Sequence, residues 1–172
     1  MSERTPGGLF LPDPDTRDEL LAPPKGGKVG TIDASAPGDH FVVTASSGFF
    51  ITDTERWCAE LHDPYVLVTD RELSEPGPLI AVLEEAAATA RPILVAAPAV
   101  RHDALVMMIA NKLRGVIYAA AVDAPIATLA AIAAATGCDV VHDEVPRPAQ
   151  LGAAKLVTVV DGELVIVRRP GH

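Results

Sequence analysis

From residue 64 onward, short uniform apolar runs alternate along the chain with longer stretches that suit helices. Three short runs are typical of buried parallel strands: residues 65–69 (YVLVT), 93–97 (ILVAA) and 116–122 (VIYAAAV). Three longer stretches are typical of helices: residues 75–90, 101–114 and 127–136. The pattern therefore predicts alternating strands and helices, with a fourth strand beginning at residues 139–141.

The ends of the predicted helices carry local signals. Ser74 is a candidate N-cap for the first helix, with Glu75 and Pro76 in its first turn. Gly115 and Gly137 follow the second and third helices, where glycine commonly ends a helix. These signals place the helix boundaries independently of the apolar pattern.

Two further patterns extend the predicted sheet. The run HFVVT within residues 39–44 predicts a strand, and residues 156–160 and 163–167 flank the pair Asp161-Gly162. Asp-Gly between two apolar strands is a strong signal for a two-residue hairpin. We therefore expect an α/β fold: helices flanking a mixed sheet that ends in a C-terminal β-hairpin.

Residues 1–37 differ in composition from the rest of the chain. They are rich in Pro, Gly and Asp, and their apolar anchors are Leu9-Phe10-Leu11 and Leu20-Leu21. We interpret this stretch as an N-terminal arm, either a flexible tail or a segment laid along the domain. The domain itself is expected over residues 38–172.

The helix predicted at 101–114 contains seven consecutive apolar residues, 104–110. A helix with one face in water shows an apolar stripe, so this helix is either buried on all sides or exposes an apolar face. The helix at 75–90 is also apolar around most of its circumference. The two could form an apolar groove, or a partner domain, a subunit or the N-terminal arm could cover them; the residues alone leave both open.

Charge and composition narrow the function classes. A net charge of −9, with scattered basic residues, argues against nucleic acid and against an anionic membrane surface as partners. No apolar run approaches the ~20 residues of a membrane helix. The polar start MSERTPGG does not resemble a signal peptide, and two cysteines are too few for a disulfide framework. We expect a cytoplasmic protein.

Motifs for catalysis and cofactors give no support to an enzyme. Neither GxxxxGK[ST] nor a GxGxxG after the first strand is present, so no nucleotide cofactor is expected. Cys58 and His62, like Cys138 and His142, are four residues apart. In a strand that spacing separates the second pair by about 13 Å, so we expect no metal site.

Several segments, taken in order, resemble the apical, polypeptide-binding domain of GroEL-type (group I) chaperonins. They are GFFITD, ELHDPYVLVTDRELS, LIAVLEEAAATARPILVAA, DALVMMIANKLRG, AAAVDAP, IAAATG and LGAAK, within about residues 38–167. The resemblance implies the apical fold, of the swivelling β/β/α type. It implies binding of non-native polypeptide, with a co-chaperonin-like protein as a second kind of partner.

The resemblance also implies binding residues. They lie in a loop and on two neighbouring helices: Ala45, Phe49, Phe50, Ile80, Leu83, Leu105, Ile109 and Ala110. The family usually has an aromatic residue where Ala45 stands. Nothing in the chain resembles the ATPase or intermediate domains, so the expected activity is ATP-independent holding of apolar segments. If the groove is exposed, we expect Leu105 and Ile109 to face outward and Ala104 and Met108 to face inward.

Three alternatives stay open from the sequence. The groove could be a dedicated socket for one specific partner. It could instead be an assembly surface that takes the arm of a second copy, with Leu9-Phe10-Leu11 or Leu20-Leu21 inserted. An enzyme on a swivelling-type domain would need a reactive histidine in a Gly/Thr-rich loop, and none of the five histidines lies in one. The oligomeric state does not follow from the sequence.

Overall fold

Three parallel strands form the centre of the molecule, as the apolar runs predict. Strands β5 (Tyr65–Val68), β6 (Ile93–Ala97) and β7 (Ala119–Asp123) pair in parallel, and every residue of β6 is buried. The computed structural model describes residues 3–21, 32–52 and 55–170. Uniformly apolar strands form here because both faces of this part of the sheet are covered.

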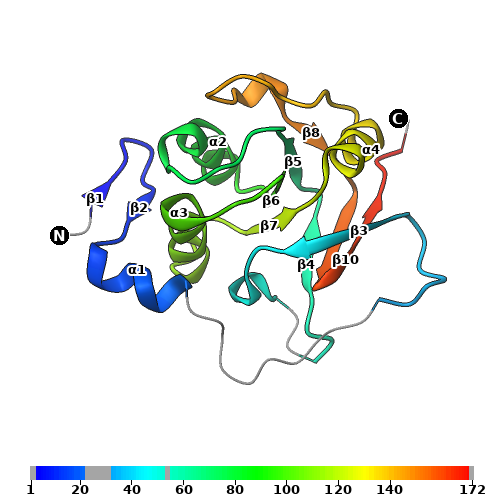
Figure 1. Cartoon of the computed structure of the whole chain (residues 1–172), viewed down its shortest axis with the longest axis horizontal. Helices are drawn as coiled ribbons and strands as arrows, with labels where there is room; N and C mark the ends of the chain where they lie inside the picture. The colour runs from blue at the N-terminus through cyan, green and yellow to red at the C-terminus, as the bar shows by residue number, and fades with distance from the viewer. Residues whose placement is uncertain (1–2, 22–31, 53–54, 171–172) are drawn as a thin grey trace.

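The helices follow the strands as predicted. Helix α2 (Ile80–Thr89) joins β5 to β6, α3 (His102–Leu113) joins β6 to β7, and α4 (Ile126–Thr136) follows β7. Figure 1 shows α2 and α3 side by side on one side of β6 and β7, with α4 on the other. Within the described residues, no helix is long and apolar enough to cross a membrane.

Among the described residues, the parallel strands belong to one mixed sheet of eight strands, in the order β4-β9-β10-β3-β7-β6-β5-β8. Strand β3 (Asp39–Ala45) links the two halves, because it pairs antiparallel with β10 along most of its length and with β7 at its end. The fold is therefore α/β with a mixed sheet and flanking helices, as predicted.

The C-terminal hairpin is confirmed. Strands β9 (Leu156–Val160) and β10 (Gly162–Val167) pair antiparallel, with Glu163 opposite Val160. This register leaves Asp161 and Gly162 as the two-residue turn, and Gly162 has a φ of 99°. Such a positive φ is costly for residues with a side chain, which is why Gly stands here.

Three predicted boundaries are wrong. Helix α2 begins at Ile80, after a 3-10 turn at Gly77–Leu79, and Ser74 is not its N-cap. Pro76 disfavours helical geometry in Glu75, the residue before it, and the turn that contains Pro78 is 3-10 and not α-helical. Residues 139–141 form only an isolated bridge, between Val141 and Thr69, and β7 begins at Ala119 instead of residue 116.

Two strands of the large sheet were not predicted. Strand β4 (Ala59–His62) pairs with β9 at one edge, and β8 (Gly152–Ala153) pairs with β5 at the other. Strand β4 has four residues and β8 has two, and both are too short for a periodic pattern to be recognised.

The N-terminal arm lies along the domain. It consists of β1 (Glu3–Arg4), β2 (Phe10–Leu11) and α1 (Pro14–Leu21), and the two strands form a small antiparallel sheet of their own. Figure 1 shows these elements, in blue, beside α3. Of the stretch 1–37 interpreted as the arm, residues 1–2 and 22–31 lie outside the described residues.

Candidate functional site

Helix α3 is buried around its whole circumference. All residues from Ala104 to Asn111 are buried, and Leu105 and Ile109 are only 8% and 0% exposed. The prediction that Leu105 and Ile109 face outward is therefore wrong. Of the two explanations for the seven-residue apolar run, burial on all sides is the correct one.

The other predicted binding residues are also wholly or partly buried. Leu83, Phe50 and Ala110 are at most 5% exposed. Ala45, Phe49 and Ile80 are partly buried and pack against the core. Ala45 and Phe50 line the same small cavity, of about 20 Å³, on the β3 side of the molecule. Together the eight residues form no exposed apolar stripe, because other parts of the same chain cover them.

One face of α3 lies against the segment that contains Phe49 and Phe50. Leu105, Ile109 and Lys112 share a helix face by their spacing of four and three residues. The Lys112 Nζ donates a hydrogen bond to the Ile51 carbonyl at 3.0 Å, and the 3-10 turn Gly48–Phe50 contacts α3. Partial burial lowers the pKa of Lys112 below its usual value. The structure thus brings the predicted loop to the predicted helix.

The N-terminal arm covers another face of α3, the one that carries Asn111. Its side chain is fully buried, and its Oδ1 accepts a hydrogen bond from the Phe10 backbone N–H at 2.7 Å. The Asn111 Nδ2 donates to the Phe10 carbonyl at 2.8 Å and to the Met107 carbonyl at 2.7 Å. One amide side chain therefore pairs with both backbone groups of an extended residue, as a neighbouring strand would.

Side chains of the arm complete its contact with α3. Leu9 is fully buried and belongs to the main hydrophobic core, and Phe10 is 9% exposed. The Arg114 guanidinium lies 3.6 Å from the centre of the Phe10 ring, in the geometry of a cation–π contact. The arm is therefore held by its backbone, by an aliphatic anchor and by an aromatic anchor.

The arm also reaches α2. The Thr5 hydroxyl donates to the Glu84 carboxylate at 2.7 Å, and the same Thr5 oxygen accepts the Leu9 N–H at 3.1 Å. Gly7 lies so close to Glu84 that a Cβ there would be 1.9 Å from the Glu84 Oε2. The arm therefore bridges α2 and α3. We define the arm groove as the surface of these two helices that carries Glu84, Asn111 and Arg114.

Sequence reasoning missed these three polar residues as members of a site. Asn111 follows the apolar run directly, and it lies one helical turn after Met107 on the same face. A polar side chain among apolar neighbours was the available signal, because a buried amide needs partners for its donors and acceptor. The partner, the backbone of Phe10, is 101 residues away and has no signature in the sequence.

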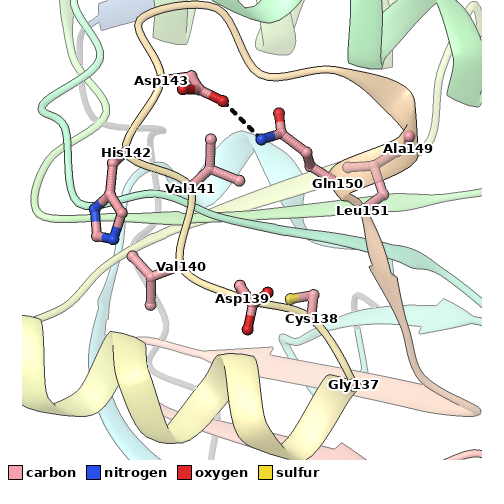
Figure 2. A pocket seen from close by; sticks show the side chains of 10 residues that line it. All are labelled: Gly137, Cys138, Asp139, Val140, Val141, His142, Asp143, Ala149, Gln150 and Leu151. Atoms are coloured by element: carbon pink, nitrogen blue, oxygen red, sulfur yellow. Dashed lines mark hydrogen bonds between the residues drawn. The ribbon is translucent and has the colours of Figure 1, made fainter.

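A pocket lies away from the arm. Figure 2 shows a pocket of about 350 Å³ along residues 137–143 and 149–151, where the Gln150 side chain donates to Asp143 at 2.8 Å. Cys138 and His142 project from opposite ends of the first segment, and burial raises the pKa of the Cys138 thiol. Within the described residues, no group of three or more His, Cys, Asp or Glu side chains could hold a metal ion.

No protein-family model matches the chain. The candidate site is the arm groove, because the contacts of Thr5 and Phe10 place an extended segment of polypeptide against two helices.

Proposed function

We propose that the arm groove binds extended apolar segments of other polypeptides without ATP, and that the domain is of the chaperonin apical type. The sequence resemblance supports the type, and so does an α/β fold in which two adjacent helices follow successive parallel strands. The mechanism is equilibrium capture, in which apolar area leaves water at roughly 25 cal/mol per Å². Such capture slows aggregation of a client but drives no folding cycle.

The single observation that carries this proposal is the pairing between Asn111 and Phe10. The amide forms hydrogen bonds with the backbone N–H and C=O of Phe10, and every non-proline residue has those same groups. A groove that recognises the main chain in this way tolerates many side chains. The Leu9 and Phe10 contacts show which side chains it accommodates in this structure, namely large apolar ones.

An aggregation assay tests the proposal. Light scattering from a thermally unfolding client is followed with the full-length protein at several-fold excess. Because the arm fills the groove, the informative protein is Phe10→Ser, which weakens the arm and leaves both helices unchanged. We expect Phe10→Ser to suppress the scattering and Phe10→Ser/Asn111→Ala to lose most of that effect.

A second double variant, Phe10→Ser/Val42→Ser, is the matched control, since Val42 lies on β3 and is 81% exposed. It should protect the client as well as Phe10→Ser does. If no variant protects any of several clients while all remain folded by circular dichroism, the proposal is wrong. Saturable binding to one native protein, without protection of unfolded clients, would instead favour a dedicated interaction module.

A further inference from the structure

The arm uses one N–H and the carbonyl oxygen of the Asn111 side chain. A neutral amide has two N–H donors and one carbonyl acceptor. One N–H is donated to Met107 within α3, and the other N–H and the oxygen are taken by Phe10. Asn111 is 0% exposed, so a second polypeptide has no access to it while Phe10 is in place.

The arm also occupies the rest of the groove. Thr5 and Gly7 lie against Glu84 on α2, and Phe10 lies against Arg114 on α3. Each of the three polar groups that define the groove is therefore in contact with residues 5–11 of the same chain.

We propose that residues 5–11 are an intramolecular competitor that closes the groove to other polypeptides until the arm is released. This inference rests on the proposed function, because it assumes that the groove can bind a chain other than its own arm. It differs from the alternative of an assembly surface, because here the occupant is the protein's own arm and not the arm of a second copy.

Because the arm is covalently tethered, its effective concentration determines how strongly it competes with a free peptide. A covalently linked segment acts at an effective concentration in the millimolar range when its linker is short and flexible. A free peptide that makes the same contacts with a dissociation constant of ~10–100 μM would then bind the closed protein at least ~10-fold more weakly than the released protein.

A reversible covalent lock tests the inference in the full-length protein. An added Cβ at Gly7 would lie 2.7 Å from the Glu84 Cγ, so Gly7→Cys/Glu84→Cys brings two Cβ atoms within disulfide range. The probe is a fluorescent peptide with the sequence TPGGLFLPD, that of residues 5–13. Its binding is measured by anisotropy with the same protein oxidised and then reduced.

We expect the oxidised protein to bind the probe at least tenfold more weakly than the reduced protein. The single variants Gly7→Cys and Glu84→Cys, oxidised in parallel, should show no such change, which controls for pairing with Cys58 or Cys138. Mass spectrometry verifies the lock. Equal binding by the locked and reduced forms would overturn the inference.

Leu9→Ser/Phe10→Ser supplies the second measurement, because it releases the arm without a disulfide. Tighter probe binding by this variant than by the wild type supports both proposals. Equally strong binding by the two, lost on Asn111→Ala, overturns the arm as a competitor and leaves the proposed function standing. If hydrogen exchange shows a released arm and a folded core but the probe does not bind, both proposals fail.

Discussion

At the scale of the residue, the most informative position is Asn111, a fully buried amide in a helix that is otherwise apolar over its central turns. A buried amide is tolerated only when its donors and acceptor are paired, and here the partners are backbone groups of the arm and of α3 itself. Asn111 therefore fixes where the arm lies along α3 as well as holding it there.

Replacing this amide tests its structural role. Asn111→Leu keeps a similar volume but leaves the buried N–H and C=O of Phe10 unpaired, at about 1–3 kcal/mol for such a loss. We expect the free energy of unfolding to fall by about that amount, or the arm to detach, with faster exchange of the Phe10 amide. Denaturant unfolding and hydrogen exchange measure the two effects.

Leu113→Ala is the matched control for this change, because Leu113 is 53% exposed on the same helix. It should alter the unfolding free energy by less than about 0.5 kcal/mol. An Asn111→Leu protein as stable as the wild type, with Phe10 exchange unchanged, would contradict the role assigned to the amide.

A second residue-scale prediction concerns His40. Its Nδ1 lies 2.8 Å from the Glu163 Oε1 and its Nε2 lies 2.8 Å from the Ala36 carbonyl. Neutral imidazole has one N–H and satisfies one of these acceptors, whereas imidazolium satisfies both. The bond to the Ala36 carbonyl, followed by the bond to Glu163, therefore raises the pKa of His40 above its usual value of 6.5.

The sign of the pH effect follows from this shift. A pKa that is higher in the folded state gives a stability contribution that is complete below about pH 6.5 and is lost as the pH rises through the folded-state pKa. Urea unfolding of the wild type and of His40→Gln between pH 5 and pH 9 measures it. The difference in unfolding free energy between the two should shrink as the pH rises, and a constant difference would contradict the prediction.

At the scale of the element, the end of α3 is a Schellman motif. The Val116 N–H bonds to the Asn111 carbonyl at 2.9 Å, the Gly115 N–H bonds to the Lys112 carbonyl at 3.1 Å, and Gly115 has a φ of 73°. The sequence pattern predicted this end of the helix correctly, because a glycine after the last helical turn has a specific geometric role.

Gly115→Ala tests the cost of this conformation. An added Cβ at Gly115 meets no atom within 4 Å, so the only penalty is the left-handed backbone, about 1–2 kcal/mol. Gly77→Ala is the control, because Gly77 has equal space and no left-handed φ. We expect thermal unfolding to show a loss for Gly115→Ala and a change within about 1 kcal/mol for Gly77→Ala. Equal effects would contradict the assignment.

The elements that were predicted and those that were missed differ in what stabilises them. The buried strand β6 and the helix α4 are defined by their own composition, so their patterns located them within one residue. Strand β4 exists because β9 lies beside it, and α2 is preceded by a 3-10 turn that its apolar pattern does not reflect. Local sequence signals predict the elements that their own residues favour. Tertiary contacts determine the position and length of the other elements.

At the scale of the whole molecule, the candidate site was also only partly predictable from the sequence. The apolar pattern of α3 left two explanations open, burial on all sides or an exposed apolar face, and the structure shows burial. The pattern could not show that the arm supplies part of that cover, because the arm contributes only a few apolar residues, among them Leu9 and Phe10. The resemblance named two helices and a loop as binding elements, but it did not predict that the N-terminal arm of the same chain would lie against both helices.

The arm is expected to be less stable than the sheet. Its two strands have two residues each and, among the residues that the structure describes, pair with no other strand, whereas β6 has a neighbouring strand on either side. Hydrogen exchange should therefore show the arm opening at a lower free energy than the global unfolding that exposes β6. Identical opening free energies for Phe10 and for residues of β6 would show that the arm unfolds only with the whole molecule.

The 101 residues that separate Phe10 from Asn111 have a consequence for how the protein is made. Synthesis proceeds from the N-terminus at roughly 5–20 residues per second, so Phe10 leaves the ribosome roughly 5–20 s before Asn111 does. During that time Leu9 and Phe10 are without their final cover, and strands β5 and β6 can be completed first. The arm is therefore translated well before α3, and it can reach its native position only after α3 has been made.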